Sequence, residues 1–216
     1  GNVTGDQSGS YILIEDPYRT GYHRIVPRNS LFTTWNTDTT NQTITIPVTG
    51  DCDVSVFWDD RVVPATQYDN SDISHSYPVA GDHYIVMRGT VSGWNAINHS
   101  VPPNSDLRGM LQCGSLRLAD LSGAFMDCSA MTWYADDALD LAGVSTLNSC
   151  FRGCDLFDGS ITGWDVSGVT DMSRMFQDCP VFNKEIGSWD VSSVTSLSGT
   201  FQNCVSFNGD IGGWVT

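Results

Sequence analysis

The sequence predicts a mainly β protein with short helices, in which an antiparallel β-sandwich precedes a repeat solenoid of about four coils. The solenoid is indicated by three stretches of 25 residues, beginning at Asp140, Asp165 and Asp190, that align without a gap. A fixed period of this length is typical of units that bury their apolar faces only against their neighbours. The sandwich is indicated by short β-branched segments, separated by turn residues, across residues 31–97.

Each repeat carries apolar residues at positions i, i+3 and i+7, which predicts one face of a helix of about two to three turns. In the stretch that begins at Asp165 these positions hold Val169, Met172 and Phe176. Serine and threonine beside the valine are candidate N-cap residues, and the helix is expected to end at Cys179. The segment from Phe182 to Ile186 then predicts a brief strand or strand-like bend that stacks on its copy in the next coil.

Three side-chain types are expected to form buried ladders through the repeats. The ladder residues are Cys128, Cys154, Cys179 and Cys204, then Phe151, Phe176 and Phe201, and then Trp164, Trp189 and Trp214. Upstream, Leu118, Leu121, Phe125, Cys128 and Met131 continue the pattern in degraded form, with one residue inserted. An atypical first repeat is expected where the end of a solenoid is shielded. The outer edge of the last coil is left for a capping partner, a second copy, a continuation or solvent.

Five strands are expected in the N-terminal half, with turn residues such as Gly50, Asp59 and Gly81 between them. They are Leu31–Trp35, Thr43–Ile46, Val54–Trp58, Ile73–Tyr77 and Tyr84–Met87. The chain therefore divides into an N-terminal arm over residues 1–30, the sandwich over 31–97 and the solenoid over 98–216. The repeats lie near residues 115–139, 140–164, 165–189 and 190–216.

The string DVSGVTDMSRMFQDCPVFNKEIGSWDVSSVT, which begins at Asp165, closely resembles the BspA-like leucine-rich repeat surface proteins. The resemblance covers roughly half of the chain and implies a leucine-rich-repeat-type solenoid. FWDDRVV and HSYPVAGDHYIVMRG resemble a turn and a hairpin of the polycystic-kidney-disease-like, Ig-like sandwich. The chain departs from these patterns at Asp158, where the repeat has Asn, and at Arg61, where the turn has Gly. Together the resemblances imply a surface-displayed, non-enzymatic protein of bacteria or of large phages and viruses.

Residues 1–30 fit neither the sandwich nor the repeat. The first ten are polar and glycine-rich, and basic side chains then alternate with aromatic ones. The candidate docking residues are Tyr18, Arg19, Tyr22, His23, Arg24 and Arg28. One interpretation is a strand and loop laid against the sandwich. The other is an arm that attaches the protein to a larger assembly.

The charge of the chain excludes several classes of partner. A formal net charge of −15 and a pI near 4.2 make nucleic acid and anionic membranes poor partners. No window approaches the run of apolar residues that a membrane span needs, so no membrane insertion is expected. Protein partners remain, either capsid or other virion proteins or a host surface protein.

The positions of the cysteines indicate that their side chains pack in the core and do not serve as reactive or ligating groups. Because four of the seven recur at one phase of the repeat, buried free thiols are expected, with a disulfide between adjacent rungs as the alternative. Cys150 occupies the phase of Met175, which also favours packing, and Cys52 and Cys113 have no assignable partner. An odd total leaves at least one thiol unpaired within the chain.

No catalytic residue, metal ligand or cofactor is nominated. The four histidines are scattered, and His75 is expected to form structural hydrogen bonds. Six acidic residues near the sandwich turns are interpreted as solvated turn acids, with a calcium site between loops as the alternative. They are Asp51, Asp53, Asp59, Asp60, Asp69 and Asp72.

Two functions are consistent with these features. The first is a structural or decoration protein of a phage or large-virus surface that makes protein contacts or host contacts. The second is an adhesin module on a bacterial cell surface that binds host or matrix proteins. Both place the chain on a virion or on an extracellular surface. Repeat positions that are expected to be exposed vary between copies and could contribute to a binding face in either function. They include Arg174, Gln177, Asp178, Lys184, Gln202 and Asn203.

Overall fold

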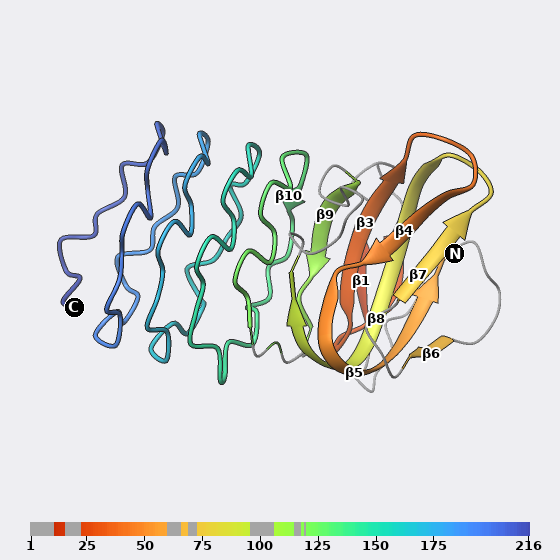
Figure 1. Ribbon diagram of the computed structural model, residues 1–216, viewed down its shortest axis with the longest axis horizontal. Coiled ribbons are helices and arrows are strands. Elements are labelled where there is room, and N and C mark those ends of the chain that lie inside the picture. The colour runs from red at the N-terminus through yellow and green to blue at the C-terminus, as the bar shows by residue number, and fades with distance from the viewer. Residues whose placement is uncertain are drawn as a thin grey trace.

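The computed structural model describes residues 11–15, 23–59, 66–68, 73–95, 106–114, 118 and 120–216. The molecule is elongated, with a β-sandwich at one end and a stack of repeat coils running away from it (Figure 1). Each repeat is called a coil below: coil 1 is the described part of 115–139, and coils 2, 3 and 4 are 140–164, 165–189 and 190–216.

The sandwich contains three groups of paired strands. β3 (Leu31–Thr37), β5 (Val48–Trp58), β6 (Thr66–Tyr68), β8 (Gly81–Trp94), β9 (Leu107–Gln112) and β10 (Thr132–Trp133) form a six-stranded sheet in the order β10-β9-β3-β8-β5-β6. β4 (Gln42–Ile46) pairs with β7 (Ile73–Tyr77), and β1 (Tyr11–Glu15) pairs with β2 (His23–Pro27), both antiparallel. All five strands expected from the sequence fall within these elements.

Alternation along the strands places one face of each sheet in a shared core. In β7 the buried residues are Ile73, His75 and Tyr77, and the residues between them are exposed. These side chains lie with Val54 and Ile85 of the large sheet in the core. The predicted hairpin over residues 75–89 is wrong, because β7 and β8 belong to different sheets. The turn between them is a corner that carries the chain from one layer to the other.

The C-terminal part of the arm is fixed to the sandwich. Val26 is buried beside Phe32, Tyr84 and Leu111 on the outer face of the large sheet. The side-chain amide of Gln112 donates to the carbonyl oxygens of Pro27, Arg28 and Ser30 at 3.0, 2.6 and 2.7 Å, which fixes the turn between β2 and β3.

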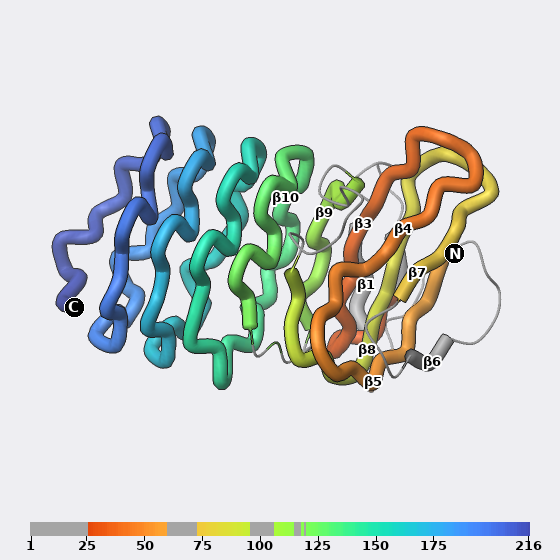
Figure 2. The backbone as a smooth tube through the Cα atoms, in the orientation of Figure 1, coloured from red at the N-terminus to blue at the C-terminus, as the bar shows by residue number. Residues whose placement is uncertain are grey.

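Successive coils lie side by side with their chains running in the same direction (Figure 2). Parallel bridges join Thr146 to Asp171 and Asp171 to Ser196. In each coil, amides at alternate positions donate to carbonyl oxygens of the next coil, as Leu147 N does to Asp171 O at 2.8 Å. The amides between them donate within the coil, as Cys150 N does to Leu147 O at 3.1 Å.

The predicted helices are wrong: none is present among the described residues, which are all-β or turns. The reason lies in the backbone. Ser149 and Gly153 have φ values of 56° and 74°, and Arg174 and Asp178 repeat this at 58° and 59°. A right-handed helix excludes positive φ, and it also needs consecutive bonds to the fourth preceding residue. The apolar i, i+3, i+7 spacing is therefore met by a chain of tight turns.

The leucine-rich-repeat-type solenoid is also wrong as a description of these coils. After β10 the described chain has no strand, and neighbouring coils share single bridges instead of a continuous strand ladder. The expected strand from Phe182 to Ile186 is absent for the same reason. In the preceding turns of coil 3, the left-handed residues Arg174 and Asp178 also prevent an extended conformation.

Coil 1 is joined directly to the sandwich. β10 pairs with β9 in parallel, and the amides of Tyr134 and Ala135 both donate to Met110 O. Gly93 at the end of β8 bridges Asp120. As a result, one continuous apolar core extends from the sandwich into coil 4. Among the described residues, no helix exists that could cross a lipid bilayer.

Candidate functional site

Aromatic side chains form two continuous ladders inside the coils. Phe151, Phe176 and Phe201 follow one another at ring-centroid distances of 5.9 Å, with interplanar angles of 1° and 14°. Within coil 3, Phe176 also stacks on Phe182 at 4.1 Å. Trp189 and Trp214 stack at 6.3 Å, and each indole donates to the carbonyl oxygen of an isoleucine in the preceding coil. These rings make the coils a rigid support for whatever their surfaces display.

The cysteine ladder is buried and hydrogen-bonded. The thiols of Cys154, Cys179 and Cys204 donate to the carbonyl oxygens of Phe125, Phe151 and Phe176 in the preceding coil, at 2.9, 2.9 and 2.7 Å. All seven cysteines are free and buried, Cys128 among them. Burial raises the pKa of the Cys179 thiol to about 12 and raises the pKa of Cys150 and Cys154 well above the usual range. Such thiols are poor nucleophiles.

We expect the native protein to react with a thiol reagent at none of its seven cysteines within the time in which free cysteine is fully labelled. The reason is that every thiol is buried, and burial raises the pKa of all of them except Cys52, for which burial alone is the argument. Titration with Ellman's reagent before and after unfolding in guanidinium checks this expectation. Rapid labelling of Cys128, Cys154 or Cys179 in the native state would contradict the ladder.

Three residues of the sandwich are arranged like a hydrolase triad. His83 Nε2 lies 3.0 Å from Thr37 Oγ1, and His83 Nδ1 lies 3.5 Å from Asp59 Oδ1. However, Thr37 is 1% exposed, and its hydroxyl accepts the amide of Gly81. The ring of Tyr77 covers His83 at a centroid distance of 3.5 Å. No substrate can reach the threonine oxygen, so this cluster fixes the β3, β5 and β8 strands together.

This arrangement was not anticipated from the sequence, because Thr37 and His83 are 46 residues apart. The β3–β8 register places Thr37 opposite Gly81 and therefore close to His83. His75, which was expected to form structural hydrogen bonds, is buried, and its ring stacks on Trp58 at 4.9 Å.

The acidic residues of the sandwich form no common site among the described residues. Asp51, Asp53 and Asp59 are exposed on β5 and at its end, while Asp60, Asp69 and Asp72 lie outside the described residues. Asp59 accepts the amide of Tyr84. Groups of three or more metal-ligating side chains are absent from the described chain. The calcium alternative therefore has no support in this part of the molecule.

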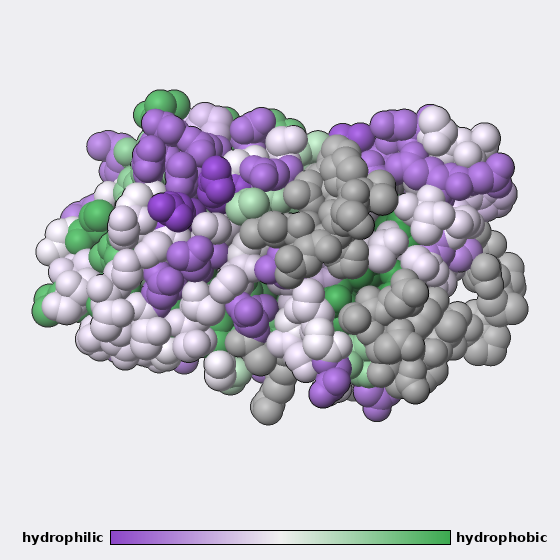
Figure 3. All heavy atoms as spheres, viewed as in Figure 1, coloured by the Kyte–Doolittle hydropathy of each residue, from purple (hydrophilic) through white to green (hydrophobic). Residues whose placement is uncertain are grey.

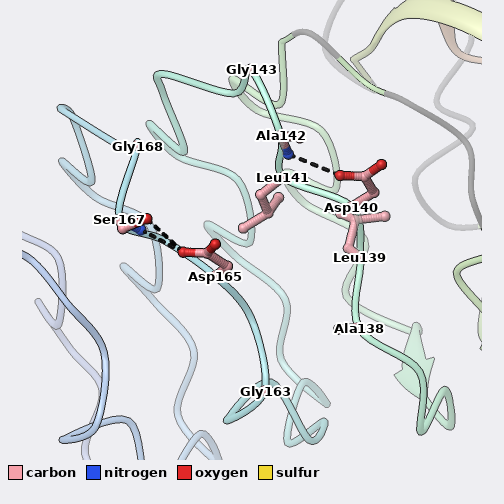
Figure 4. A pocket seen from close by; sticks show the side chains of 10 residues that line it. All are labelled: Ala138, Leu139, Asp140, Leu141, Ala142, Gly143, Gly163, Asp165, Ser167 and Gly168. Carbon is pink, nitrogen blue, oxygen red and sulfur yellow. Dashed lines mark hydrogen bonds between the residues drawn. The ribbon is translucent and has the colours of Figure 1, made fainter.

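A shallow groove of about 370 Å³ lies where coils 2 and 3 begin (Figure 4). Its polar groups are Asp140, Asp165 and Ser167, and Leu139 and Gly168 complete the wall. Asp140 accepts the amide of Ala142, and Asp165 accepts both the amide and the hydroxyl of Ser167 at 3.1 and 2.6 Å. The hydroxyl and amide of Ser167 lower the pKa of Asp165. Because its carboxylates close their own turns, the groove is structural in character.

The most distinctive exposed feature is an apolar ridge made of Leu156, Val181 and Val205, one residue from each of coils 2, 3 and 4. Their exposed fractions are 51%, 42% and 82%. Each lies in a tight turn between a buried cysteine and a phenylalanine, such as Cys179 and Phe182, whose backbone hydrogen bond measures 3.3 Å. The phenylalanine is buried in coils 2 and 3 and partly buried in coil 4. On the face of the stack seen in Figure 3, pale and hydrophilic residues predominate, and hydrophobic ones form small separate patches.

Side-chain contacts between coils fix the ridge on one side. Asp158 accepts the amide of Asn183, and the Asn183 side chain accepts the amide of Asn208 in the next coil. Asp158 also pairs with Lys184 at 2.8 Å. Asp158 replaces Asn at this position of the repeat and performs the same role. Asp155 and Asp158 are exposed next to Leu156 in the sequence, and the charge of Asp158 is balanced by Lys184.

The residues nominated from the sequence fall in three places. Tyr18, Arg19 and Tyr22 lie outside the described residues, His23 and Arg24 belong to β2, and Arg28 is exposed in the following turn. All cysteine, phenylalanine and tryptophan ladder residues lie inside the coils, although Phe201 and Trp214 are only partly buried. Of the predicted exposed phases, Arg174, Gln202 and Asn203 are exposed, and Gln177, Asp178 and Lys184 are half-buried.

The apolar ridge was missed from the sequence because Leu156 and Val181 look like further core residues. The available signal was their position two residues after a ladder cysteine, between two buried phases. At Val205 the apolar residue comes directly after the cysteine, so a strict phase comparison does not align all three.

Residues 119–216 match a family described as "Mycoplasma protein of unknown function, DUF285". The resemblance to BspA-like leucine-rich repeat proteins with a polycystic-kidney-disease-like domain is therefore corrected: the match is to DUF285, and the helices that the resemblance implies are absent from the described residues. No curated protein and no solved structure matches the chain.

Proposed function

We propose that this protein is a non-enzymatic module that is displayed on a surface and binds other proteins through the side of its coil stack. The apolar ridge of Leu156, Val181 and Val205 carries the proposal, because it is exposed on a support that is otherwise fully packed. Exposed apolar side chains on neighbouring units of a rigid stack are a common sign of a protein interaction site. A rigid ridge also binds with little loss of conformational entropy.

The charge around the ridge defines the chemistry of its partner. Asp155 and Asp158 are exposed next to Leu156 in the sequence, and the whole chain has a net charge of −15. A partner with an apolar patch bordered by lysine or arginine would complement both features. Nucleic acid and anionic membranes remain unsuitable partners, since the same charge repels them.

Two surfaces are candidates for display. A virion surface is favoured by the basic and aromatic residues of the N-terminal arm. Three of these residues, Tyr18, Arg19 and Tyr22, lie outside the described residues. A bacterial cell surface is favoured by the match of residues 119–216 to a family described as a Mycoplasma protein, because it points to a bacterial chain. We therefore place the adhesin-like cell-surface role ahead of virion decoration, with a host or matrix protein as the partner.

The experiment compares the binding of three purified proteins to host cells, to extracellular-matrix proteins and to particles from the source. Val181→Asp places a charge in the centre of the ridge, and Val79→Asp makes the same change at a residue that is 66% exposed in the sandwich. We expect Val181→Asp to weaken binding at least about tenfold while Val79→Asp retains it. Equal binding by all three proteins would contradict a role for the ridge.

A further inference from the structure

The apolar ridge is carried by three stacked tight turns. Each turn is closed by a backbone hydrogen bond from a phenylalanine amide to a cysteine carbonyl oxygen, at 3.1 Å in coil 2, 3.3 Å in coil 3 and 3.1 Å in coil 4. Leu156 and Val181 occupy the third position of their turns, and Pro180 occupies the second position in coil 3, where its fixed φ suits a turn. A bond from Ser206 N to Pro180 O at 3.2 Å joins the turns of coils 3 and 4. The backbone therefore holds the ridge in one conformation.

The exposure of the ridge belongs to the side of the stack. Leu156 and Val181 are 51% and 42% exposed, although coils 2 and 3 each have a neighbouring coil on both sides. Val205 extends the row into coil 4 from the second position of its turn, which is the position of Pro180 in coil 3. The row therefore shifts sideways by one residue between Val181 and Val205.

The distance between successive turns selects the kind of element that fits the ridge. The phenylalanine that follows each ridge turn stacks on its copy in the next coil. The ring centroids of Phe157 and Phe182 are 5.8 Å apart, and those of Phe182 and Phe207 are 5.7 Å apart. Because rings related by the repeat are separated by about the same distance as the turns that hold them, the ridge side chains follow one another at a similar interval.

An α-helix presents side chains at this interval. Residues i and i+3 or i+4 of a helix have Cβ atoms about 5 to 6 Å apart. Same-face residues of one strand are about 6.6 to 6.8 Å apart, and neighbouring strands of a sheet lie about 4.7 to 4.9 Å apart. Over the two steps from Leu156 to Val205, either of these spacings falls out of step by about 2 Å, whereas a helix stays in step. The side-chain rows of a helix are also inclined to its axis, which suits the sideways shift at Val205.

The charge of the coils selects the composition of such a helix. Residues 120–216 contain thirteen acidic side chains and only three basic ones, which are Arg152, Arg174 and Lys184. Lys184 is already paired with Asp158 at 2.8 Å, whereas Asp155 beside Leu156 forms no ion pair within the described chain. A helix whose apolar face is bordered by lysine or arginine would complement this charge.

Building on the binding role proposed above, we infer that the apolar ridge receives a basic amphipathic α-helix of the partner protein, which lies along the stack. Leu156, Val181 and Val205 would insert between the apolar residues at i, i+3 or i+4, and i+7 of this helix. About two to three helical turns would span the three coils. Basic residues at the border of the apolar face would lie near Asp155.

The experiment uses two synthetic peptides of about 14 residues with the same alanine, leucine and lysine content. One is held helical by a lactam cross-link and has leucines at i, i+4 and i+7, and the other has its leucines at alternate positions, as on one face of a strand. Binding to the natural protein, to Val181→Asn and to Val79→Asn is measured by fluorescence anisotropy at physiological salt. Val181→Asn removes the central apolar contact without adding charge, and Val79→Asn makes the same change at a residue that is 66% exposed in the sandwich.

We expect the helical peptide to bind the natural protein at least about tenfold more tightly than the alternating peptide does. Val181→Asn should weaken the binding of the helical peptide at least about fivefold, while Val79→Asn should retain it. Equal binding of the two peptides would overturn the assignment of a helix, because charge alone would then explain it. Tighter binding of the alternating peptide would overturn it in favour of a strand, and equal binding of the helical peptide by all three proteins would place that peptide away from the ridge.

The binding of host cells and matrix proteins to Val181→Asp separates the helix from the binding role of the ridge. If that binding depends on Val181 but the helical peptide does not, the ridge keeps its role and the helix is wrong. If neither depends on Val181, both are wrong.

Discussion

Replacing Phe176 by alanine is expected to destabilise the protein by about 3 to 5 kcal/mol, since a completely buried phenylalanine leaves a cavity that its neighbours cannot fill. The Phe176 ring contacts Phe151 and Phe201 at 5.9 Å and Phe182 at 4.1 Å, so its loss interrupts the phenylalanine ladder and removes the ring that stacks on Phe182. A domain is typically stable by only about 5 to 15 kcal/mol. Urea denaturation followed by tryptophan fluorescence measures the loss.

Phe201→Ala is the matched control for this prediction. Phe201 occupies the same phase in coil 4 but is only partly buried and stacks on a phenylalanine of just one neighbouring coil. The change should therefore cost clearly less than Phe176→Ala. Equal losses for the two variants would show that the ladder is not continuous through coil 3.

The protein is expected to lose stability steeply as the pH rises above about 8.5, the ordinary pKa of cysteine. Burial raises the pKa of the folded Cys128, Cys150, Cys154 and Cys179 thiols. Between the unfolded and folded pKa values, the unfolded chain releases protons that the folded chain keeps, so the free energy of unfolding falls with pH. Each thiol contributes about 1.4 kcal/mol per pH unit in this window.

The measurement is the free energy of unfolding from pH 7 to pH 10.5, for the natural protein and for Cys179→Ala. The variant loses the thiol bond to Phe151 O and should start from lower stability, but its slope above pH 9 should be shallower by the contribution of one thiol. Parallel slopes for both proteins would contradict a buried, protonated Cys179.

The sequence predicted the sandwich strands and the buried ladders because both depend on local alternation or on strict repetition. The strand from Ile73 to Tyr77 alternates buried and exposed residues, and strict alternation of this kind indicates a half-buried β-strand. The recurrence of Cys154, Cys179 and Cys204 at one phase required a common environment in every coil. Repetition shows which residues are equivalent, whatever their backbone conformation.

The helices were predicted wrongly because apolar spacing does not determine φ. Val169, Met172 and Phe176 all point into the core, as an amphipathic helix would require. The chain between them instead contains Arg174 with a φ of 58°, and no pattern in the sequence predicts this backbone conformation. Arginine rarely adopts this region, and the hydrogen bond from its amide to Ser198 O in coil 4 stabilises it. Contacts between coils override local propensity here.

The candidate binding features could not be read from the sequence for a related reason. Leu156 and Val181 are apolar like the ladder residues, and only the turn geometry turns them outwards.

The central structural claim is that each coil alternates amides bonded within the coil with amides directed at the next coil. Residue-resolved hydrogen exchange of coil 4 tests it most directly, because coil 4 has no following coil among the described residues. We expect slow exchange at Thr200, Gln202 and Cys204, which donate within the coil at 3.1 to 3.2 Å, and fast exchange at Gly199, Phe201 and Asn203 between them. An uninterrupted run of slow amides from 199 to 204 would instead indicate a helix and would contradict this account.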